Sequence, residues 1–572
     1  MVSLKTQEWR FRKEDIGLAQ SISEKLDIDM ILSRILACRS IRGAEQAYDF
    51  LHPNLRNLHD PFLFRDMEPA VNRIGEALET GEGITVHGDY DVDGITSTAL
   101  LLTALSERAG KGALNHFLPS RFEEGYGISR SCMDEMSKRG DTLLITVDCG
   151  IKAIEEIESA GSSGIDVILT DHHEPGKTVP DASAVIDPKV EGTDYPFKEL
   201  AGVGVAFKLA TALQMRELIG TDVRELLDLV ALGTVSDLVP LIDENRPMVH
   251  FGLDRLGTTN HIGLAMLMSE SGLDPRRKIR SGDVAFKLGP RMNSAGRLAH
   301  PGLALDLILT KDRVDAELFA RELSTLNFKR QAIGKRLVTE VLEEIERNGY
   351  ADDPFLVVGK NDWNPGVIGV SAAKLVEITG KPTIVLTIEN EIARGSARAP
   401  GGFNLVEALG SVSDLLLEHG GHERAAGLTL RYEEIPELRR RLCHLVDERY
   451  PDHSFIPQID IDLDLNLSEL DLDSVISLEA LGPIGMGNPQ PVISVRDVSI
   501  GYDISAVGEG KHLKFSIVDK ESSIGCIWFN MGNLLGSLGP GSVVTVAGVP
   551  EVHSWRGSKD VQLRILDIYS DG

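Results

Sequence analysis

The chain has 572 residues, of which 42% are hydrophobic and 26% charged, and its formal net charge is −28. This length suits about three or four domains, and the composition excludes a largely disordered chain. No apolar run reaches the roughly 20 residues that a membrane-spanning helix needs, and the N-terminus lacks the apolar core of a signal peptide. The five cysteines are widely spaced and form no CxxC pair, which argues against a disulfide framework or a structural zinc site. We therefore expect a cytoplasmic protein with no membrane partner.

Residues 1–60 show short amphipathic patterns, around 19–26, 30–36 and 44–51, that predict helices. They contain no recognisable catalytic or binding motif. We expect this segment to be helical and to pack against the domain that follows it.

From about residue 61 the pattern alternates between strand and helix, which predicts βαβ units and a mostly parallel sheet. Residues 84–86 have the apolar, β-branched character of a buried strand end, and 96–105 predict the helix that follows. Between them are four ionisable side chains at alternate positions: His87, Asp89, Asp91 and Asp93. Carboxylates this close repel one another in a shared buried pocket, and a bound cation removes that cost. A solvated acidic turn is the alternative.

Three later apolar stretches, at 143–147, 167–170 and 229–236, also end in ionisable side chains. These are Asp148, the run Asp171, His172 and His173, and Asp237. In an open parallel α/β sheet the carboxyl ends of the strands face one crevice, so these groups can converge there. An ordinary strand-to-loop aspartate explains each stretch alone, but four such stretches in one chain favour a metal site.

The segment that follows is basic. Between Arg276 and Arg336 there are fourteen Lys or Arg and six Asp or Glu, a surplus of eight positive charges on an acidic chain. Such a patch favours a nucleic-acid track over an ordinary solvated helix surface. The helical pattern at 312–348 predicts a helix of roughly 50 Å that connects two domains.

Residues 349–453 predict a second α/β domain, with strands at 355–358 and 382–387. Polar and glycine-rich stretches after these strands contain Ser396, Arg398 and His422. Glycines let a backbone approach an anionic ligand, and these three side chains can donate hydrogen bonds to it. Ordinary turns around a buried histidine are the alternative.

Residues 454–572 have short alternating strands separated by Gly and Pro turns, which predict an antiparallel β-barrel. Four aromatic side chains in it either stack on bases or fill the core: Phe515, Trp528, Phe529 and Trp555.

Four motifs resemble those of the DHH phosphoesterase superfamily. They are His-Gly-Asp-Tyr-Asp-Val-Asp-Gly at 87–94, Val-Asp-Cys-Gly at 147–150, Thr-Asp-His-His at 170–173 and Gly-Thr-Val-Ser-Asp at 233–237. Within the superfamily the chain is most similar to the bacterial single-strand-specific 5′→3′ DNA exonucleases, over essentially its whole length. The resemblance implies an α/β protein with a C-terminal OB-fold. Its implied parts are an N-terminal segment (1–60), a DHH catalytic domain (61–311), a connecting helix (312–348), a DHH-associated substrate-binding domain (349–453) and a nucleic-acid-binding OB-fold (454–572).

The resemblance also implies two divalent cations, Mn²⁺ first with Mg²⁺ as a substitute, which hydrolyse a phosphodiester. The implied ligands of one ion are Asp91, Asp148 and either His87 or Asp89; those of the other are Asp93, Asp148, His172 and Asp237. His173 is implied to contact the scissile phosphate or protonate the leaving oxygen, with Asp171 orienting the histidines.

Further implied contacts concern the substrate. The phosphate-binding candidates are Arg121, Asn293 and Arg297. Those for a 5′-terminal phosphate opposite the metals are Ser396 and Arg398, together with Arg121, and His422 is a further donor of the same domain. The implied enzyme degrades single-stranded DNA from the 5′ end to 5′-mononucleotides in DNA repair and recombination. We expect a monomer that receives its substrate from a helicase and a single-strand-binding protein.

Three other functions share part of this pattern. A small-substrate DHH oligoribonuclease or cyclic-dinucleotide phosphodiesterase generally lacks the long helix and the barrel. A catalytically silent nucleic-acid-binding scaffold would have lost metal ligands, and none is lost here. An inorganic pyrophosphatase of the superfamily fits this chain length and barrel least well.

Overall fold

The computed structural model describes residues 2–3, 7–110, 112–121, 127–274, 277–451, 455–520, 522–555 and 557–570. The chain forms two compact units. The first, here called the catalytic unit, comprises Pro53–Arg336 and Pro483–Pro489. The second, the outer unit, comprises Met1–His52, Leu337–Gly482 and Gln490–Gly572.

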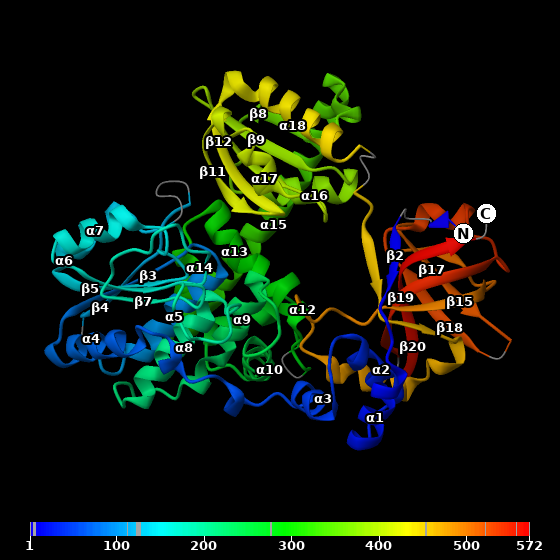
Figure 1. The fold of residues 1–572 in the computed structure, drawn as a ribbon, viewed down its shortest axis with the longest axis horizontal. Coiled ribbons are helices and arrows are strands. Elements are labelled where there is room, and N and C mark those ends of the chain that lie inside the picture. Colours follow the sequence, from blue (N-terminus) through cyan, green and yellow to red (C-terminus); the bar gives the residue numbers. More distant parts are fainter. Residues whose placement is uncertain are drawn as a thin grey trace. The chain divides into compact units, whose positions relative to one another are not determined.

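A five-stranded parallel sheet organises the catalytic unit, with strand order β4-β3-β5-β6-β7 (Figure 1). Its strands are β3 (Gly83–Gly88), β4 (Leu114–Phe117), β5 (Asp141–Val147), β6 (Asp166–Thr170) and β7 (Ala184–Ile186). The helices α5 (Val92–Leu105), α8 (Gly202–Met215) and α9 (Leu227–Asp237) are buried along most of their length, in line with sequences made mostly of apolar and small residues. The predicted parallel sheet is therefore confirmed.

The other helices of this unit surround that core and lead into the long helix. They are α4 (Met67–Thr80), α6 (Arg130–Arg139), α7 (Ile154–Ser162), α10 (Asn245–Leu256), α11 (Ile262–Glu270), α12 (Ser281–Asp283), the π-helical turn η4 (Val284–Leu288), α13 (Gly289–Leu298) and α14 (Gly302–Leu309). The long helix α15 (Arg313–Asn348) has 36 residues, as the pattern at 312–348 predicted.

Two local elements position candidate site residues, and the first differs from the prediction. Helix α5 begins at Val92 rather than near residue 96, because the side chain of Asp91 caps it by accepting from the backbone N–H groups of Asp93 and Gly94. The Gly/Pro-rich stretch from 288 to 298 is the helix α13, whose Pro290 lies in the first turn, where a missing N–H costs no hydrogen bond.

The outer unit contains a second five-stranded sheet, of order β11-β12-β10-β9-β8, in which only β8 and β9 pair in parallel. Its elements are β8 (Leu356–Asn361), α16 (Ile368–Thr379), β9 (Thr383–Glu389), β10 (Ile392–Arg398), α17 (Leu405–Gly410), β11 (Leu416–His422), β12 (Ala425–Arg431) and α18 (Ile435–Arg449). The glycine-rich stretch around 420–427, expected to be a loop, forms the paired ends of β11 and β12.

The C-terminal strands close into a barrel because β15 pairs with both β19 and β17. The barrel strands are β15 (Ile493–Ile500), β17 (His512–Val518), β18 (Ser523–Trp528), β19 (Val543–Trp555) and β20 (Ser558–Ser570), with β14 (Leu463–Leu465) and β16 (Ser505–Val507) at its edges. The β18–β20 pair is parallel, so the predicted antiparallel barrel is antiparallel only in its other ring pairs. Phe515 and Trp528 are buried core, whereas Phe529 is partly exposed. The Trp555 side chain lies outside the described part of the structure.

The N-terminal segment departs from the expected packing on the catalytic domain. Its helices α1 (Ile16–Leu26), α2 (Met30–Cys38) and α3 (Ala44–Leu51) are present as predicted. They are preceded by β1 (Val2–Ser3), paired with β20, and by β2 (Glu8–Phe11), paired in parallel with β13 (Gln458–Ile461). The Trp9 indole donates to Asp567 at 2.9 Å and stacks on Tyr569. These contacts tie residues up to 52 to the C-terminal strands of the outer unit.

No described helix combines the length and the apolar character that crossing a membrane requires.

Candidate active site

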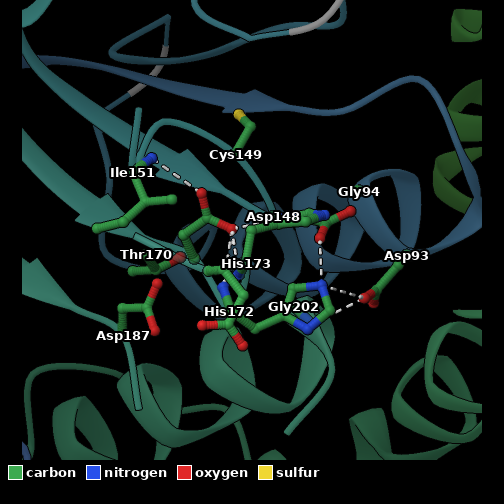
Figure 2. Close-up of polar contacts among 12 residues, drawn as sticks. Asp93, Gly94, Asp148, Cys149, Ile151, Thr170, His172, His173, Asp187 and Gly202 are labelled. Atoms are coloured by element: carbon green, nitrogen blue, oxygen red, sulfur yellow. Dashed lines mark hydrogen bonds and ion pairs between the residues drawn. The ribbon is translucent and has the colours of Figure 1, made fainter. Parts of the chain in front are cut away.

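Ionisable side chains gather at the carboxyl edge of the parallel sheet (Figure 2). The aspartates 89, 91 and 93 follow β3, Asp148 follows β5, and the Asp171–His173 run follows β6. Asp237 is the last residue of α9. The sequence therefore brings these groups together by ending neighbouring parallel strands, and one buried helix, at the same edge.

His172 lies at the centre of this group. Its Nε2 is 3.1 Å from Asp148 Oδ1, 3.7 Å from Asp237 Oδ2 and 3.9 Å from Asp93 Oδ2. Within the described residues, three sets of ligand atoms lie close enough to share one metal ion. They are Asp89, Asp91 and Asp148; Asp93, His172 and Asp237; and Asp148, His172 and His173. Asp148 belongs to two of these sets, which is the geometry expected of a bridging ligand.

The N-terminus of α8 holds Asp93. Its two carboxylate oxygens accept from the backbone N–H groups of Gly202 and Val203, at 2.7 and 2.8 Å. A side chain at position 202 would meet the Cβ of Asp148 at 2.6 Å, so a glycine allows this close approach. Burial, followed by repulsion from Asp91, raises the pKa of Asp93 to about 7 despite these two hydrogen bonds.

Several buried polar atoms at the site have no hydrogen-bond partner within the described structure. They include Asp89 Oδ1, Asp148 Oδ1, His172 Nε2 and His87 Nε2. Burial and neighbouring carboxylates raise the pKa values of Asp89 and Asp148, while burial lowers that of His172 to about 3. Unsatisfied buried polar groups are costly, and a cation would satisfy both the carboxylates and a neutral imidazole. The donor set therefore fits divalent metal ions.

The backbone of Asp148 has a φ of 61°, in the left-handed region that residues other than glycine rarely adopt. Such strain collects at functional sites, where the surrounding structure imposes it. Here it sets the direction of the carboxylate that points toward His172.

Asp171 orients the histidines rather than facing the ligand cluster. Its Oδ1 accepts from His173 Nδ1 at 2.7 Å and from the backbone N–H groups of His172 and His173, and its Oδ2 accepts from the N–H of Ile151. Burial opposes the charge of Asp171, but the bonds from His173 and the backbone outweigh it and lower its pKa. Burial likewise opposes protonation of His173, and the hydrogen bond to Asp171 outweighs it and raises the pKa of that imidazole.

His87 and Asp89 are placed differently. The His87 ring is fully buried, stacks on Phe117 and lies with Nδ1 3.6 Å from Cys149 Sγ. His87 belongs to none of the three sets of ligand atoms, whereas Asp89 joins Asp91 and Asp148 in one of them. Of the two alternatives, the arrangement of the described residues favours Asp89.

The candidate phosphate contacts of the catalytic unit surround the turn after β3. The Arg121 guanidinium lies 5.4 Å from the centroid of the Tyr90 ring, and Asn293 Oδ1 accepts from the N–H of Val92 at 3.3 Å. Arg297 interacts electrostatically with Arg121, Tyr90 and Asp91. Residues 122–126 of the loop predicted to carry Arg121 lie outside the described residues.

The candidates of the outer unit share one face of its sheet. Ser396 lies opposite Gly427, which lies opposite Gly420, and Arg398 lies opposite Ala425, which lies opposite His422. Residues directly across a ladder point to the same side, so Ser396, Arg398 and His422 project from one face, on which the positions opposite Ser396 and Arg398 are the small residues Gly427 and Ala425.

A helix N-terminus meets this face. Arg398 donates to Ser396 Oγ at 2.9 Å, and a Cβ at Gly369, in the first turn of α16, would be 3.0 Å from that oxygen. Donors and a helix N-terminus together suit an anion. His422 is exposed, so the alternative of a buried histidine is wrong.

The sequence patterns missed two residues beside the cluster. Asp187 directly follows β7 and is buried; its Oδ1 accepts from the N–H of Lys189 at 2.7 Å, while its Oδ2 has no partner within the described structure. Burial raises the pKa of Asp187 to about 7. The Lys189 ammonium lies 3.4 Å from Glu174 and opposes the rise in the pKa of Asp237. The signal was the position of Asp187 at a strand end, as for the other acids.

Comparison with known families gives three matches. Residues 83–234 match the DHH family, N-terminal domain; residues 352–448 match the DHHA1 domain; and residues 461–567 match the RecJ OB domain. The predicted succession of DHH, DHH-associated and OB-fold domains is confirmed.

Curated relatives are similar over nearly the whole chain. "Single-stranded-DNA-specific exonuclease RecJ" of Bacillus subtilis (strain 168) is 40% identical over 562 residues, which cover 98% of this chain and 70% of that protein. The protein of that name from Escherichia coli (strain K12) is 32% identical over 584 residues, covering 98% and 99%.

Solved structures agree with these relatives. The crystal structure of RecJ in complex with Mn²⁺ from Thermus thermophilus matches with a TM-score of 0.85 and 29% identity, over 99% of this chain and 80% of that one. The complex with Mg²⁺ from the same organism matches with a TM-score of 0.78 and 28% identity, over 99% and 79%. The predicted α/β architecture and the resemblance to DHH phosphoesterases are thereby confirmed.

Proposed function

The chain belongs to the RecJ family of single-stranded-DNA-specific exonucleases. We therefore propose that the ionisable side chains around His172, here called the DHH cluster, hydrolyse phosphodiester bonds at an end of single-stranded DNA. The observation that carries this proposal is the convergence of Asp93, Asp148 and Asp237 within 3.9 Å of His172 Nε2. The comparisons do not favour the oligoribonuclease, cyclic-dinucleotide phosphodiesterase or silent-scaffold alternatives, since the full-length relatives are named as exonucleases.

The mixed carboxylate and imidazole donors suit two divalent cations, Mn²⁺ first with Mg²⁺ as a substitute. The proposed ligands of one are Asp89, Asp91 and Asp148; those of the other are Asp93, Asp148, His172 and Asp237. Cations held there would supply an activated water and stabilise the charge on the phosphoryl oxygens.

The chain's own groups orient the reaction. We assign His173 to the scissile phosphate, where its proton passes to the oxygen that leaves. Asp171 keeps that imidazole protonated and directed, because its Oδ1 accepts from His173 Nδ1 at 2.7 Å. Arg121, Asn293 and Arg297 would hold the strand through its phosphates beside the turn after β3.

We assign the choice of the 5′ end, and so the direction of degradation, to residues of the outer unit. Ser396 and Arg398, with His422 on the same face, are proposed to bind the terminal 5′-phosphate, so that degradation runs 5′→3′ and releases 5′-mononucleotides. Support comes from the pairing of these donors with the N-terminus of α16.

The roles of the enzyme in DNA repair and recombination, and the delivery of its substrate by a helicase or a single-strand-binding protein, stay predictions. So do a monomeric state and a cytoplasmic location.

The testing experiment incubates the protein with Mn²⁺ and DNA labelled at the 5′ or the 3′ end, single-stranded or duplex. We expect early release of labelled mononucleotide from 5′-labelled single strands and little release from blunt duplex. Release that starts at the 3′ end would contradict the assigned polarity, and an inert protein would contradict the proposed function.

A further inference from the structure

Arg330, on the part of α15 that belongs to the catalytic unit, lies beside the candidate phosphate contacts without being one of them. It is close enough to Arg297 for the two guanidinium groups to repel each other, and Arg297 is repelled by Arg121 as well. Burial and these two neighbours lower the pKa of Arg297 to about 10. Arg297 therefore lies between two other cations, Arg330 and Arg121, and Arg121 lies over the Tyr90 ring in the turn that carries the aspartates.

The contacts of Arg330 leave its charge uncompensated. Its Nη2 donates to Asn327 Oδ1 at 2.9 Å, and Asn327 is itself buried. Its Nε is shielded from solvent and has no hydrogen-bond partner within the described structure. Among the described residues no carboxylate forms an ion pair with Arg330 or Arg121. A shielded cation without a counter-charge is costly, so a structural role alone does not account for this arrangement.

The helices that carry Arg297 and Arg330 are held in a fixed register. Ser294 Oγ of α13 donates to the carbonyl of Leu323 on α15, at 3.2 Å. Arg291 Nε, also from α13, donates to Ser324 Oγ at the same distance. Helix α13 and the part of α15 up to Arg336 lie in one compact unit, and the two helices are adjacent in Figure 1. The contacts between the two helices therefore fix the backbone positions of Arg297 and Arg330 relative to each other.

We propose that Arg330 completes, with Arg121 and Arg297, a three-arginine site that binds a phosphodiester group of the DNA strand next to the metal cluster. This inference rests on the proposed function and adds a residue to it. The occupant is a phosphate because its oxygens can accept from several planar guanidinium forks at once and offset their mutual repulsion. A carboxylate carries the same single negative charge, but its two oxygens lie in one plane, whereas a tetrahedral phosphodiester presents its oxygens in several directions and can meet more than one guanidinium group.

The test measures the binding of a fluorescent oligo-dT strand by anisotropy in EDTA, so that no cleavage occurs, over a series of salt concentrations. Arg330→Gln should weaken binding roughly ten- to a hundredfold, as expected when a charge-assisted hydrogen bond is removed. It should also reduce the slope of log Kd against log salt by about 0.7, the value expected when one fewer phosphate of a single strand is neutralised. A structural defect alone would not change that slope.

The matched control is Arg347→Gln. Arg347 lies on the same helix but outside the basic segment 276–336, and it is exposed and paired with Glu344 at 2.6 Å, so its substitution should change neither affinity nor slope. Arg330→Lys keeps the charge but not the fork, so it should keep the slope while losing at least about threefold in affinity.

The inference is overturned if Arg330→Gln binds the strand with the affinity and the salt slope of the wild type. Should that variant fail to fold, wild-type affinity of Arg330→Lys would overturn it instead. Wild-type cleavage of the same strand in Mn²⁺ separates the two proposals. An active wild type with unaltered Arg330 variants refutes only the arginine site, whereas an inactive wild type refutes the proposed function.

Discussion

The ionisable cluster around His172 and the sheet face that carries Ser396, Arg398 and His422 both present candidate functional side chains on a five-stranded sheet, yet they are built in opposite ways. Asp93, Asp148 and His172 are almost fully buried, at 1%, 2% and 6% exposure, and two of them have oxygen or nitrogen atoms without partners. Ser396 and Arg398 are half-buried and already bonded to each other, and Ala425 separates Arg398 from an exposed His422. A buried cluster of like charges is incomplete without its ligand, whereas an open face is stable without one. Substitutions should therefore have their largest effects in the cluster.

The largest effect is expected from Asp148→Asn, which removes the shared carboxylate. Activity should fall roughly a thousandfold or more, because a metal centre supplies several kcal/mol of transition-state stabilisation and each ~1.4 kcal/mol is tenfold in rate. Thermal melts should show an unchanged or higher Tm without metal, since one repelling charge is lost, and no further rise with Mn²⁺. The exposed Asp181→Asn serves as control. A full Mn²⁺-induced shift in Asp148→Asn would contradict the bridging role.

Asp171→Asn should cost roughly ten- to a hundredfold in kcat, as is typical for residues that orient metal-site histidines. The asparagine N–H groups would face donors that now point at Asp171, and His173 would lose the charge that raises its pKa. If His173 acts as an acid, activity falls as pH rises through its pKa, so the alkaline limb of the pH profile should move to lower pH. Mn²⁺ stoichiometry from calorimetry should be unchanged. An unmoved alkaline limb would exclude His173 as the proton donor.

Arg398→Ala tests the sheet face that carries Ser396, Arg398 and His422. The KM for 5′-phosphorylated single strands should rise roughly tenfold, the worth of one charge-assisted contact, with little change for 5′-hydroxyl strands. The exposed Arg431→Ala, on β12 of the same sheet, is the control. If the wild-type protein has the same KM for 5′-phosphorylated and 5′-hydroxyl strands, there is no basis for a 5′-phosphate site.

The smallest expected effect is the pH dependence of metal binding. Below the pKa of about 7 of the Asp93 carboxyl, a cation must displace its proton, so the affinity for Mn²⁺ should rise with pH. The rise should approach tenfold per unit below pH 7 and diminish above it, because the proton is then already lost. Calorimetry at pH 6, 7 and 8 measures this trend. A constant affinity between pH 6 and 7 would mean that Asp93 is not a ligand.

Much of the cluster was predictable from sequence because a parallel sheet converts order along the chain into position in space. Each of three apolar strands ends in an acid or histidine, so Asp89, Asp148 and His172 had to meet once the strands paired in parallel. Asp187 escaped notice because β7 has only three residues, too few for an apolar pattern to be recognised.

Other features of the fold and of the site depend on tertiary packing, which local sequence patterns do not predict. Arg330 is one of many cations in a 36-residue helix, and only the register between α13 and α15 brings it to Arg297. The N-terminal strand β2 pairs with β13, roughly 450 positions away, which no local periodicity can reveal. The hairpin of β11 and β12 was predicted as a loop because glycine has low strand propensity.

We propose that four segments of the chain form a binuclear metal centre: the turn after β3, the ends of β5 and β6, and the end of α9. Anomalous diffraction at the manganese edge, from crystals grown with Mn²⁺, tests it most directly. We expect two peaks within bonding distance of the cluster, one beside His172, Asp93 and Asp237 and the other beside Asp89 and Asp91, with Asp148 between them. Manganese bound elsewhere, or no peak at His172, would contradict the account.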